Sequence, residues 1–461
     1  MSINADAAAD RAPDSAGVQL ADQIARDVAA SKASPGAVIA SETELRALHS
    51  AGRPVFRQAI RILEERGIAF MRRGHGGGLV VSEPNADFAG RALSIVIESL
   101  TDDLRALSLL PKAVDAHLFL YSARSISLEK CEELRRLAHR LDRLSDEEFL
   151  RTGAHRRLHK AIRTASGEPA VALGHRTATE YGIDVIPYSV NVAAEGSKGE
   201  AWRITYDTAE ALIAGDAARM FDCRRRQLEM FRASWPQWSA IDRDPGLAPK
   251  INDPDRPEFQ LAGNRAERLA REILREIRLN GWKAGERIGG GAELIARYGA
   301  TTPVLRQAVR MLQEHRAVEV ERGRTGGVFV AVPDRPRAVA HAKAFLRHGA
   351  AAPEDVEAFL LNIMLEALDG GLIIRKEDLR KALAPTRGVT FGALSTAIAL
   401  TSANPPLDIF VEILLPFLPV DQGATVTADM VAETFASGDL AQRRRILLAC
   451  ARQAPPSSFG R

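Results

Sequence analysis

Three arginines at intervals of four residues are the side chains most able to do chemistry in this chain. Arg53, Arg57 and Arg61 lie in the segment RPVFRQAIRILEER, and on a helix this spacing places them on one face while apolar residues turn to the other. A guanidinium on a helix in the major groove of DNA can form two hydrogen bonds with O6 and N7 of guanine. An ordinary solvated helix face is the alternative, and the spacing alone favours that alternative.

A glycine-rich basic segment follows the predicted helix. Residues 68–71 and 79–81 are mostly apolar and predict two strands. Four residues open the tip between the strands: Arg72, Arg73, Gly74 and His75. Three further glycines would let the backbone approach phosphates or enter a minor groove, and the arginines add attraction that does not depend on base sequence. The segment therefore predicts a β-hairpin wing, which favours the nucleic-acid interpretation of the arginine row.

The preceding residues must position this helix and hairpin. LADQIARDVAAS predicts an amphipathic helix that stops before the Ser-Pro-Gly turn at 34–36. Ser41 with Glu44 three residues later is a capping box, which predicts the start of a short second helix. The arginine-bearing helix should begin around residues 52–54, where a proline is tolerated because its missing N–H has no partner in a first turn. Three helices and a wing result.

Length and composition describe an ordinary folded protein. A chain of 461 residues predicts two to four domains. Hydrophobic residues make up 46% and charged residues 26%, as in globular rather than disordered or membrane chains. A formal net charge of +3 is too small to predict nucleic-acid binding from the whole chain, so local clusters must carry that interpretation.

The cysteines, residues 1–17 and residues 388–407 argue against disulfide-rich, zinc-binding, exported and membrane-spanning proteins. Cys131, Cys223 and Cys450 form no CxxC pair, so neither a disulfide framework nor a zinc knuckle is expected, and a cytoplasmic protein fits best. Residues 1–17 are acidic without an apolar core, which predicts a flexible tail rather than a signal or transit peptide. Residues 388–407 are uncharged but polar enough to predict a buried helix and a turn, with no membrane span.

The winged pattern occurs twice. Residues 54–85 and 303–334 match at 14 of 32 positions without a gap, at an offset of 303 − 54 = 249. In the second copy Gly290 stands where Ser41 does, Thr302 replaces the equivalent of Arg53, and Thr301 is expected to cap the helix. The other predicted contact residues remain: Arg306, Arg310, Arg322, Gly323 and Arg324.

The differences between the copies predict unequal contributions. Losing one bidentate arginine should cost about 1–3 kcal/mol of base discrimination at one position. We therefore expect both copies to contact DNA, the second with less discrimination. The alternative is that the second copy only packs against its neighbour.

The first copy resembles a known family. PGAVIASETELRALHSAGRPVFRQAIRILEERGIAFMRRGHGGGLVV is similar to the winged helix-turn-helix of GntR bacterial transcription regulators. The resemblance implies that Arg53 and Arg57 contact operator bases and that Arg73 and Gly74 belong to the wing. A further family arginine in the second helix falls on Thr43 here, so that contact is expected to be missing.

Residues 88–237 have helical periodicity, as in LEKCEELRRLAHRLDRL, and resemble the all-helical effector-binding (FCD) domain of the FadR subgroup. The pieces that carry the resemblance are LHKAIRTASGEPAV and AEALIAGDAARMFDCRRRQ. In that subgroup an aspartate and three histidines hold a metal, which holds a carboxylate effector. The corresponding positions here are His155, His159, Thr205 and Gln227. This set predicts no metal or other cofactor.

The sequence still allows an effector site that contains no metal. His155 and His159 are one helical turn apart and could share a ligand, and a small organic acid is the effector that the resemblance implies. The alternative is that both are surface or groove histidines. Arg105 could pair with an acidic effector or be an ordinary surface arginine.

The last segment repeats the helical pattern faintly, in LSTAIALTSANPPL and TADMVAETFASGDLAQRRRILLAC. Its metal positions hold Phe391, Ser395, Ala428 and Cys450, so no metal is expected and a packed core or dimerising surface is favoured.

These patterns predict a mainly α fold with two winged helix-turn-helix modules, each followed by an all-helical FCD-like domain. The predicted parts are a tail (1–17), a winged module (18–86), a helical domain (87–238), a linker rich in Asp and Pro (239–263), a second winged module (264–334) and a degenerate helical domain (335–461).

The predicted function is sequence-specific binding of double-stranded operator DNA by a regulator, as a pseudo-dimer within one chain, with higher oligomers left open. FCD regulators generally act as dimers, so two copies suggest an imperfect palindrome with half-sites about 34 Å apart. A ligand-binding or assembly protein that retains the winged fold is the alternative. No nucleophile triad, phosphate loop, metalloprotease helix or carboxylate pair stands out in the sequence, so an enzyme is not expected.

Overall fold

The computed structural model describes most of the chain. The described residues are 16–31, 33–74, 76–83, 85–101, 103–119, 126–152, 154–180, 198–243, 265–321, 323, 326–372, 374–385, 388–419 and 426–451. They are mainly helical, with two small sheets. The chain divides into two compact units, one formed by Met1–Ala89 with Ala344–Ala350 and the other by Gly90–Lys343 with Ala351–Arg461. None of the described helices is long and apolar enough to cross a membrane.

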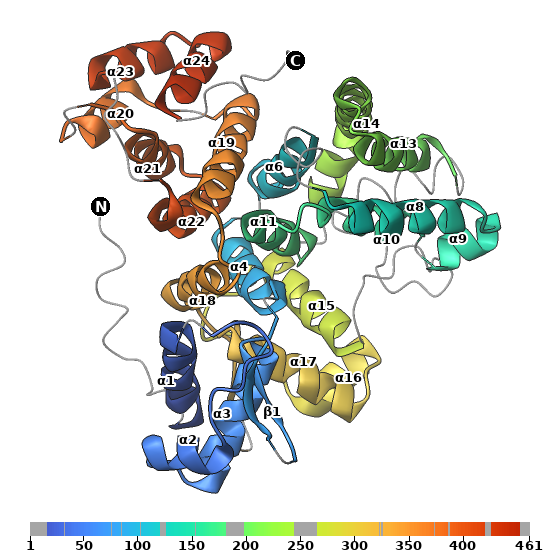
Figure 1. The fold of residues 1–461 in the computed structure, drawn as a ribbon, viewed down its shortest axis with the longest axis vertical. Helices are drawn as coiled ribbons and strands as arrows, with labels where there is room; N and C mark the ends of the chain where they lie inside the picture. The colour runs from blue at the N-terminus through green and yellow to red at the C-terminus, as the bar shows by residue number, and fades with distance from the viewer. Residues whose placement is uncertain are drawn as a thin grey trace. The chain divides into compact units, whose positions relative to one another are not determined.

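The first unit contains three helices and a hairpin (Figure 1, blue). Its elements are α1 (Ala16–Ser31), α2 (Glu42–Leu48), α3 (Arg53–Glu65), β1 (Ala69–Arg72) and β2 (Gly78–Val81). The strands pair antiparallel, Ala69 opposite Val81, and Val38 adds an isolated bridge to the hairpin. Apolar residues of α1 and α3 and of both strands form one core beneath the hairpin, which holds α3 in place.

The predicted capping box begins α2. Ser41 Oγ accepts a hydrogen bond from the Glu44 backbone N–H (3.3 Å), and the Glu44 carboxylate accepts one from the Ser41 N–H (2.8 Å). Hydrogen bonding to the carboxylate by the backbone N–H and the side chain of Ser41 favours its charged form and lowers the pKa of Glu44. The helix α3 begins directly after Gly52, with Pro54 in its first turn as predicted.

The second unit contains a segment with the same order of elements, plus a strand, β3 (Arg287–Gly289), where the first unit has only the isolated bridge at Val38. The elements of this segment are α15 (Arg265–Leu279), β3, α16 (Gly291–Tyr298), α17 (Thr302–Glu314), β4 (Val318–Glu321) and β5 (Gly327–Val330). The sheet order is β3-β5-β4, all antiparallel. The apolar core of this segment also includes Ile95, which comes from α4 (Asp87–Leu100), a helix about 170 residues earlier in the chain.

Three details of the predictions are wrong. Thr301 precedes α17 but its side chain makes no capping hydrogen bond; Pro303 supplies no N–H, and the bond to the Val304 N–H, the other usual donor, is not formed. The helix α1 starts inside the predicted tail, at Ala16, and Gly17 packs against the side chain of Gln58. The helix α14 (Ala217–Arg243) runs five residues into the predicted linker, whose first proline is Pro245.

Helices make up the rest of the second unit. From the earlier part of the chain come α5 (Leu104–Leu107), α6 (Leu109–His117), α8 (Leu128–Asp142), α9 (Asp146–Thr152), α10 (Ala154–Arg163), α11 (Pro169–Glu180), α13 (Glu200–Ala214) and α14. From the later part come α18 (Arg335–His348, whose last residues belong to the first unit), α19 (Pro353–Asp369), α20 (Lys376–Leu383), α21 (Phe391–Ser402), α22 (Pro405–Leu414), a 3-10 turn (Leu415–Phe417), α23 (Ala428–Ala436) and α24 (Leu440–Cys450).

The two groups of helices meet at α6 and α19 (Figure 1). The helix α11 packs on α6 and also contacts α19, while α22 packs on α19 and also contacts α6. The contact is close: a Cβ added to Gly174 of α11 would lie 2.5 Å from the ring of Phe359 on α19. The same ring meets the imidazole of His117 edge-on, with 5.6 Å between ring centres.

Candidate nucleic-acid interface

The arginine row of α3 faces solvent. Arg53, Arg57 and Arg61 are exposed, while Phe56 and Leu63 on the opposite face are buried in the core of the first unit. Among the described residues, Arg53 and Arg57 form no hydrogen bond or ion pair. A helix whose buried side is fixed by packing therefore presents guanidinium groups outward, which is the geometry required for contact with base edges.

The wing tip depends on backbone shapes that glycine adopts readily. Gly74 and Gly76 have φ of 101° and 74°. The Gly77 N–H donates to the Gly74 carbonyl (2.9 Å), and the Arg72 guanidinium donates to the Gly76 carbonyl (3.3 Å). His75, predicted as part of this tip, lies outside the described residues.

The base of the wing is closely packed. Gly78 opens β2, and a Cβ there would lie 2.5 Å from the Ala40 carbonyl oxygen, so no larger residue fits without movement of the backbone. Arg72 and Arg73 are both exposed beside it. The hairpin is thus rigid at its base and carries two outward cations.

The second winged segment presents fewer cations. Arg306 and Arg310 on α17 are exposed, and Thr302 occupies the first position of the helix. Gly323 is described and has φ of 121°, whereas Arg322 and Arg324 lie outside the described residues.

Two glutamates on β4 were missed from the sequence. Glu319 and Glu321 are exposed on the outer strand of the second wing. The alternating letters VEVE were the available signal for them. Gly290 begins α16 without a side chain to accept a bond, so only the Glu293 half of a capping box is present, with the Gly290 N–H 3.0 Å from its carboxylate.

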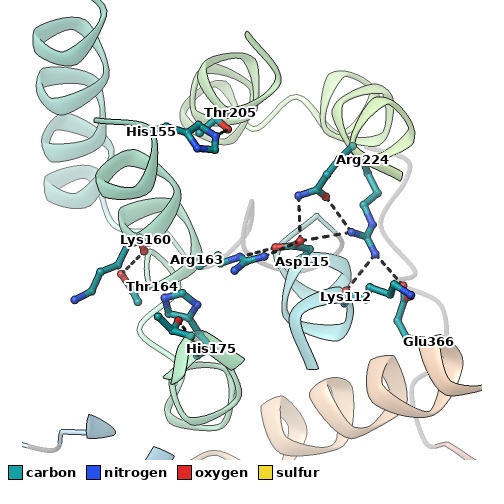
Figure 2. Close-up of polar contacts among 12 residues, drawn as sticks. Lys112, Asp115, His155, Lys160, Arg163, Thr164, His175, Thr205, Arg224 and Glu366 are labelled. Carbon is teal, nitrogen blue, oxygen red and sulfur yellow. Dashed lines mark hydrogen bonds and ion pairs between the residues drawn. The ribbon is translucent and has the colours of Figure 1, made fainter. Parts of the chain in front are cut away.

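The candidate effector residues lie in a buried polar cluster of the second unit (Figure 2). His155 is 6% exposed and its Nε2 lies 2.7 Å from the hydroxyl of Thr205. Its ring stacks on that of His159, with 5.9 Å between centres. The surface alternative is therefore wrong for His155, because α13 covers this face of α10.

A buried ion pair that the sequence did not reveal stands beside these histidines. Arg163 donates two hydrogen bonds to Asp115, at 2.7 and 2.9 Å, and both side chains are under 10% exposed. The Gln227 amide donates to the same carboxylate at 3.0 Å. Asp115 thus joins α6, α10 and α14. Of the residues singled out in the sequence, Gln227 contacts the Asp115–Arg163 pair and Thr205 contacts His155.

Arg224 extends this network to α19. Its guanidinium donates to Glu366 (3.0 Å), to the Lys112 carbonyl (3.1 Å) and to the Gln227 amide oxygen (3.0 Å). Figure 2 shows Arg224 reaching from α14 across α6 toward Glu366. Burial raises the pKa of Glu366.

The imidazoles of the cluster are held neutral. Burial, helped by the nearby charge of Arg163, lowers the pKa of His175 to about 3, and the same two causes lower the pKa of His159 well below its usual value. His175 Nδ1 is buried with no hydrogen-bond partner in the described part of the chain. Arg105 lies in α5, and its side chain is outside what the structure describes. The described residues contain no group of three or more His, Cys, Asp or Glu placed to hold a metal ion.

Comparison with known proteins gives a short sequence match and a weak structural likeness. No protein-family model matches the chain. Over 72 residues, 16% of the chain, it is 38% identical to a protein of Mycobacterium gastri described as an HTH-type transcriptional regulator, RmpR. The chain covers about a quarter (26%) of that relative. A solved structure of Streptococcus agalactiae GntR is 20% identical, covering 47% of this chain and 98% of its own, with a TM-score of 0.28. The chain is thus similar to a transcriptional regulator over one short stretch.

Proposed function

We propose that this chain is a GntR-type transcriptional regulator that binds double-stranded operator DNA. The observation that carries the proposal is the exposed arginine face of α3 beside a rigid, cationic hairpin, since this pair of elements can supply both base contacts and phosphate contacts. The short likeness to an HTH-type regulator supports the same assignment.

The two winged segments act, in this proposal, as the two halves of one reading head built by tandem duplication. At the offset of 249, α19 corresponds to residues 104–120, because 353 − 249 = 104 and 369 − 249 = 120. Those residues include α5 and α6, so corresponding helices pack on one another. The helical pieces LHKAIRTASGEPAV and LSTAIALTSANPPL match at a smaller offset, 394 − 158 = 236, at which α11 corresponds to residues 405–416, where α22 lies. The contacts of α11 with α19 and of α22 with α6 are then reciprocal, which supports a pseudo-two-fold arrangement. We keep the domain boundaries predicted from the sequence, except that the first helical domain ends at Arg243, the last residue of α14.

The buried cluster of the first helical domain is the proposed effector site, with a small organic acid as ligand. Met364, which corresponds to Asp115 at the same offset, is buried in the second helical domain, so an apolar residue suffices there. Because an apolar set of similar volume often stabilises a bundle as well as a buried ion pair does, retention of Arg163 and Asp115 favours a binding role. Arg163 supplies the positive charge that a carboxylate requires.

Selection of duplexes from a random DNA pool by the full chain tests the DNA-binding proposal. Arg57→Ala should weaken binding to the selected duplex by about fivefold to 150-fold, the loss of about 1–3 kcal/mol expected for one bidentate contact. Arg136→Ala, which removes an exposed arginine from α8, is the matched control. Enrichment of no sequence, or equal affinities of the two variants, would favour the alternative of a ligand-binding or assembly protein.

A further inference from the structure

The two wings differ in charge. Residues 69–81 contain two arginines and no acidic residue, a formal charge of +2. Residues 318–330, the same length, contain two arginines and two glutamates, a formal charge of zero. The second wing has therefore lost the excess positive charge that attracts the first to phosphates.

The register of the strands places the glutamates at defined positions. In the first wing Arg72 pairs with Gly78, and in the second Glu321 pairs with Gly327. Both members of the pair are shifted by 249, since 321 − 72 = 249 and 327 − 78 = 249. Glu321 thus occupies the position of Arg72, at the end of the strand where the tip begins.

Both glutamates are available to act on DNA. Glu319 and Glu321 alternate with Val320 and lie on the same face of the strand, and both are exposed. Neither forms an ion pair among the described residues. A carboxylate brought to the distance at which Arg72 would contact a phosphate repels it instead. The helix α17 retains exposed arginines and can still attract DNA. The repulsion that we expect from the two glutamates therefore concerns the wing and not the helix.

We propose that the two winged modules bind DNA in different ways, the first through α3 and its wing and the second through α17 alone with its wing held off the phosphates. This inference rests on the proposed function. It predicts a footprint with wing protection in the minor groove at one end of the operator, and a site whose two ends are read with different numbers of contacts.

The test uses the full chain and a duplex that the full chain selects from a random pool. Hydroxyl-radical footprinting should show wing protection on one side only, and Arg72→Ala with Arg73→Ala should remove it and reduce the salt slope by nearly two. Glu319→Gln with Glu321→Gln should tighten binding about threefold to tenfold at low salt. Glu354→Gln with Glu377→Gln is the charge-matched control on α19 and α20 and should leave affinity unchanged.

Several results would overturn the proposal. Equal minor-groove protection at both ends would show that both wings bind. If Glu319→Gln with Glu321→Gln altered affinity no more than the control pair, the two glutamates would not repel the DNA, and the proposal would also fail. Failure to select any duplex would remove the DNA-binding function itself and this inference with it, and is distinguished from the other results by the absence of a footprint. Circular dichroism of each variant establishes that it is folded.

Discussion

Ile95→Ala tests whether the second winged segment depends on a helix from a distant part of the chain. Ile95 on α4 is 4% exposed and belongs to the apolar core of that segment. Two ion pairs flank it, Arg91 with Glu267 (3.3 Å) and Arg278 with Glu98 (3.7 Å). All four charged side chains are partly exposed, so each pair should contribute less than about 1 kcal/mol.

The apolar contact dominates the expected effect. Truncating a buried isoleucine to alanine costs about 2–5 kcal/mol, from lost burial and from the cavity left behind. A local loss near 3 kcal/mol corresponds to about a hundredfold faster hydrogen exchange wherever exchange requires local opening. The change should therefore appear in the amides of α15 and α17.

Hydrogen exchange measured by mass spectrometry is the assay. Ile97→Ala is the control, because Ile97 lies on the same helix and is fully buried but outside this core. Unchanged protection of α15 and α17 in the Ile95 variant would refute the dependence. Equal loss of protection in both variants would show a general weakening of α4 instead.

Two further predictions concern the buried polar cluster. Asp115→Asn should lower the free energy of unfolding by about 3–5 kcal/mol in urea titrations, because the Arg163 charge loses its buried carboxylate; a loss below 1 kcal/mol would mean that water reaches the pair. His175 has a pKa near 3 when folded and near 6.5 when unfolded, so only the unfolded state takes up a proton as pH falls through this interval and stability declines. His175→Gln should reduce the decline between pH 6.5 and pH 5 by about 2 kcal/mol, and an unaltered pH profile of stability would contradict the burial of a neutral imidazole.

The local features of the winged segments could be predicted from sequence because their causes lie within a few residues. The spacing of Arg53, Arg57 and Arg61 fixes one helix face, and the Ser41 capping box fixes where α2 begins. The cap expected at Thr301 is absent, and Asn404, which also precedes a proline at the second helical position, does cap its helix, so the proline alone does not decide this feature.

Features that join distant parts of the chain could not be predicted. Asp115 and Arg163 are 48 residues apart on different helices, and no spacing marks them as partners. Ile95 has the same apolar character as its neighbours on α4, so nothing in its local pattern indicates that it joins the core of the second winged segment. Thr205 and Gln227 were singled out by resemblance to a family rather than by periodicity, and their proposed role in binding an effector stays a prediction.

If the chain is the pseudo-dimer proposed above, the packing of α6 on α19 removes a restriction that applies to symmetric dimers. In a homodimer each side chain near the axis faces a copy of the same surface, so every substitution enters twice. In the proposed duplication, the position held by His117 in one half corresponds to Glu366 in the other, since 117 + 249 = 366. His117 lies 3.2 Å from the Asn362 amide and 2.6 Å from Glu168, whereas Glu366 accepts a bond from Arg224. Each half can therefore acquire its own hydrogen bonds across the interface and diverge without a matching change in the other.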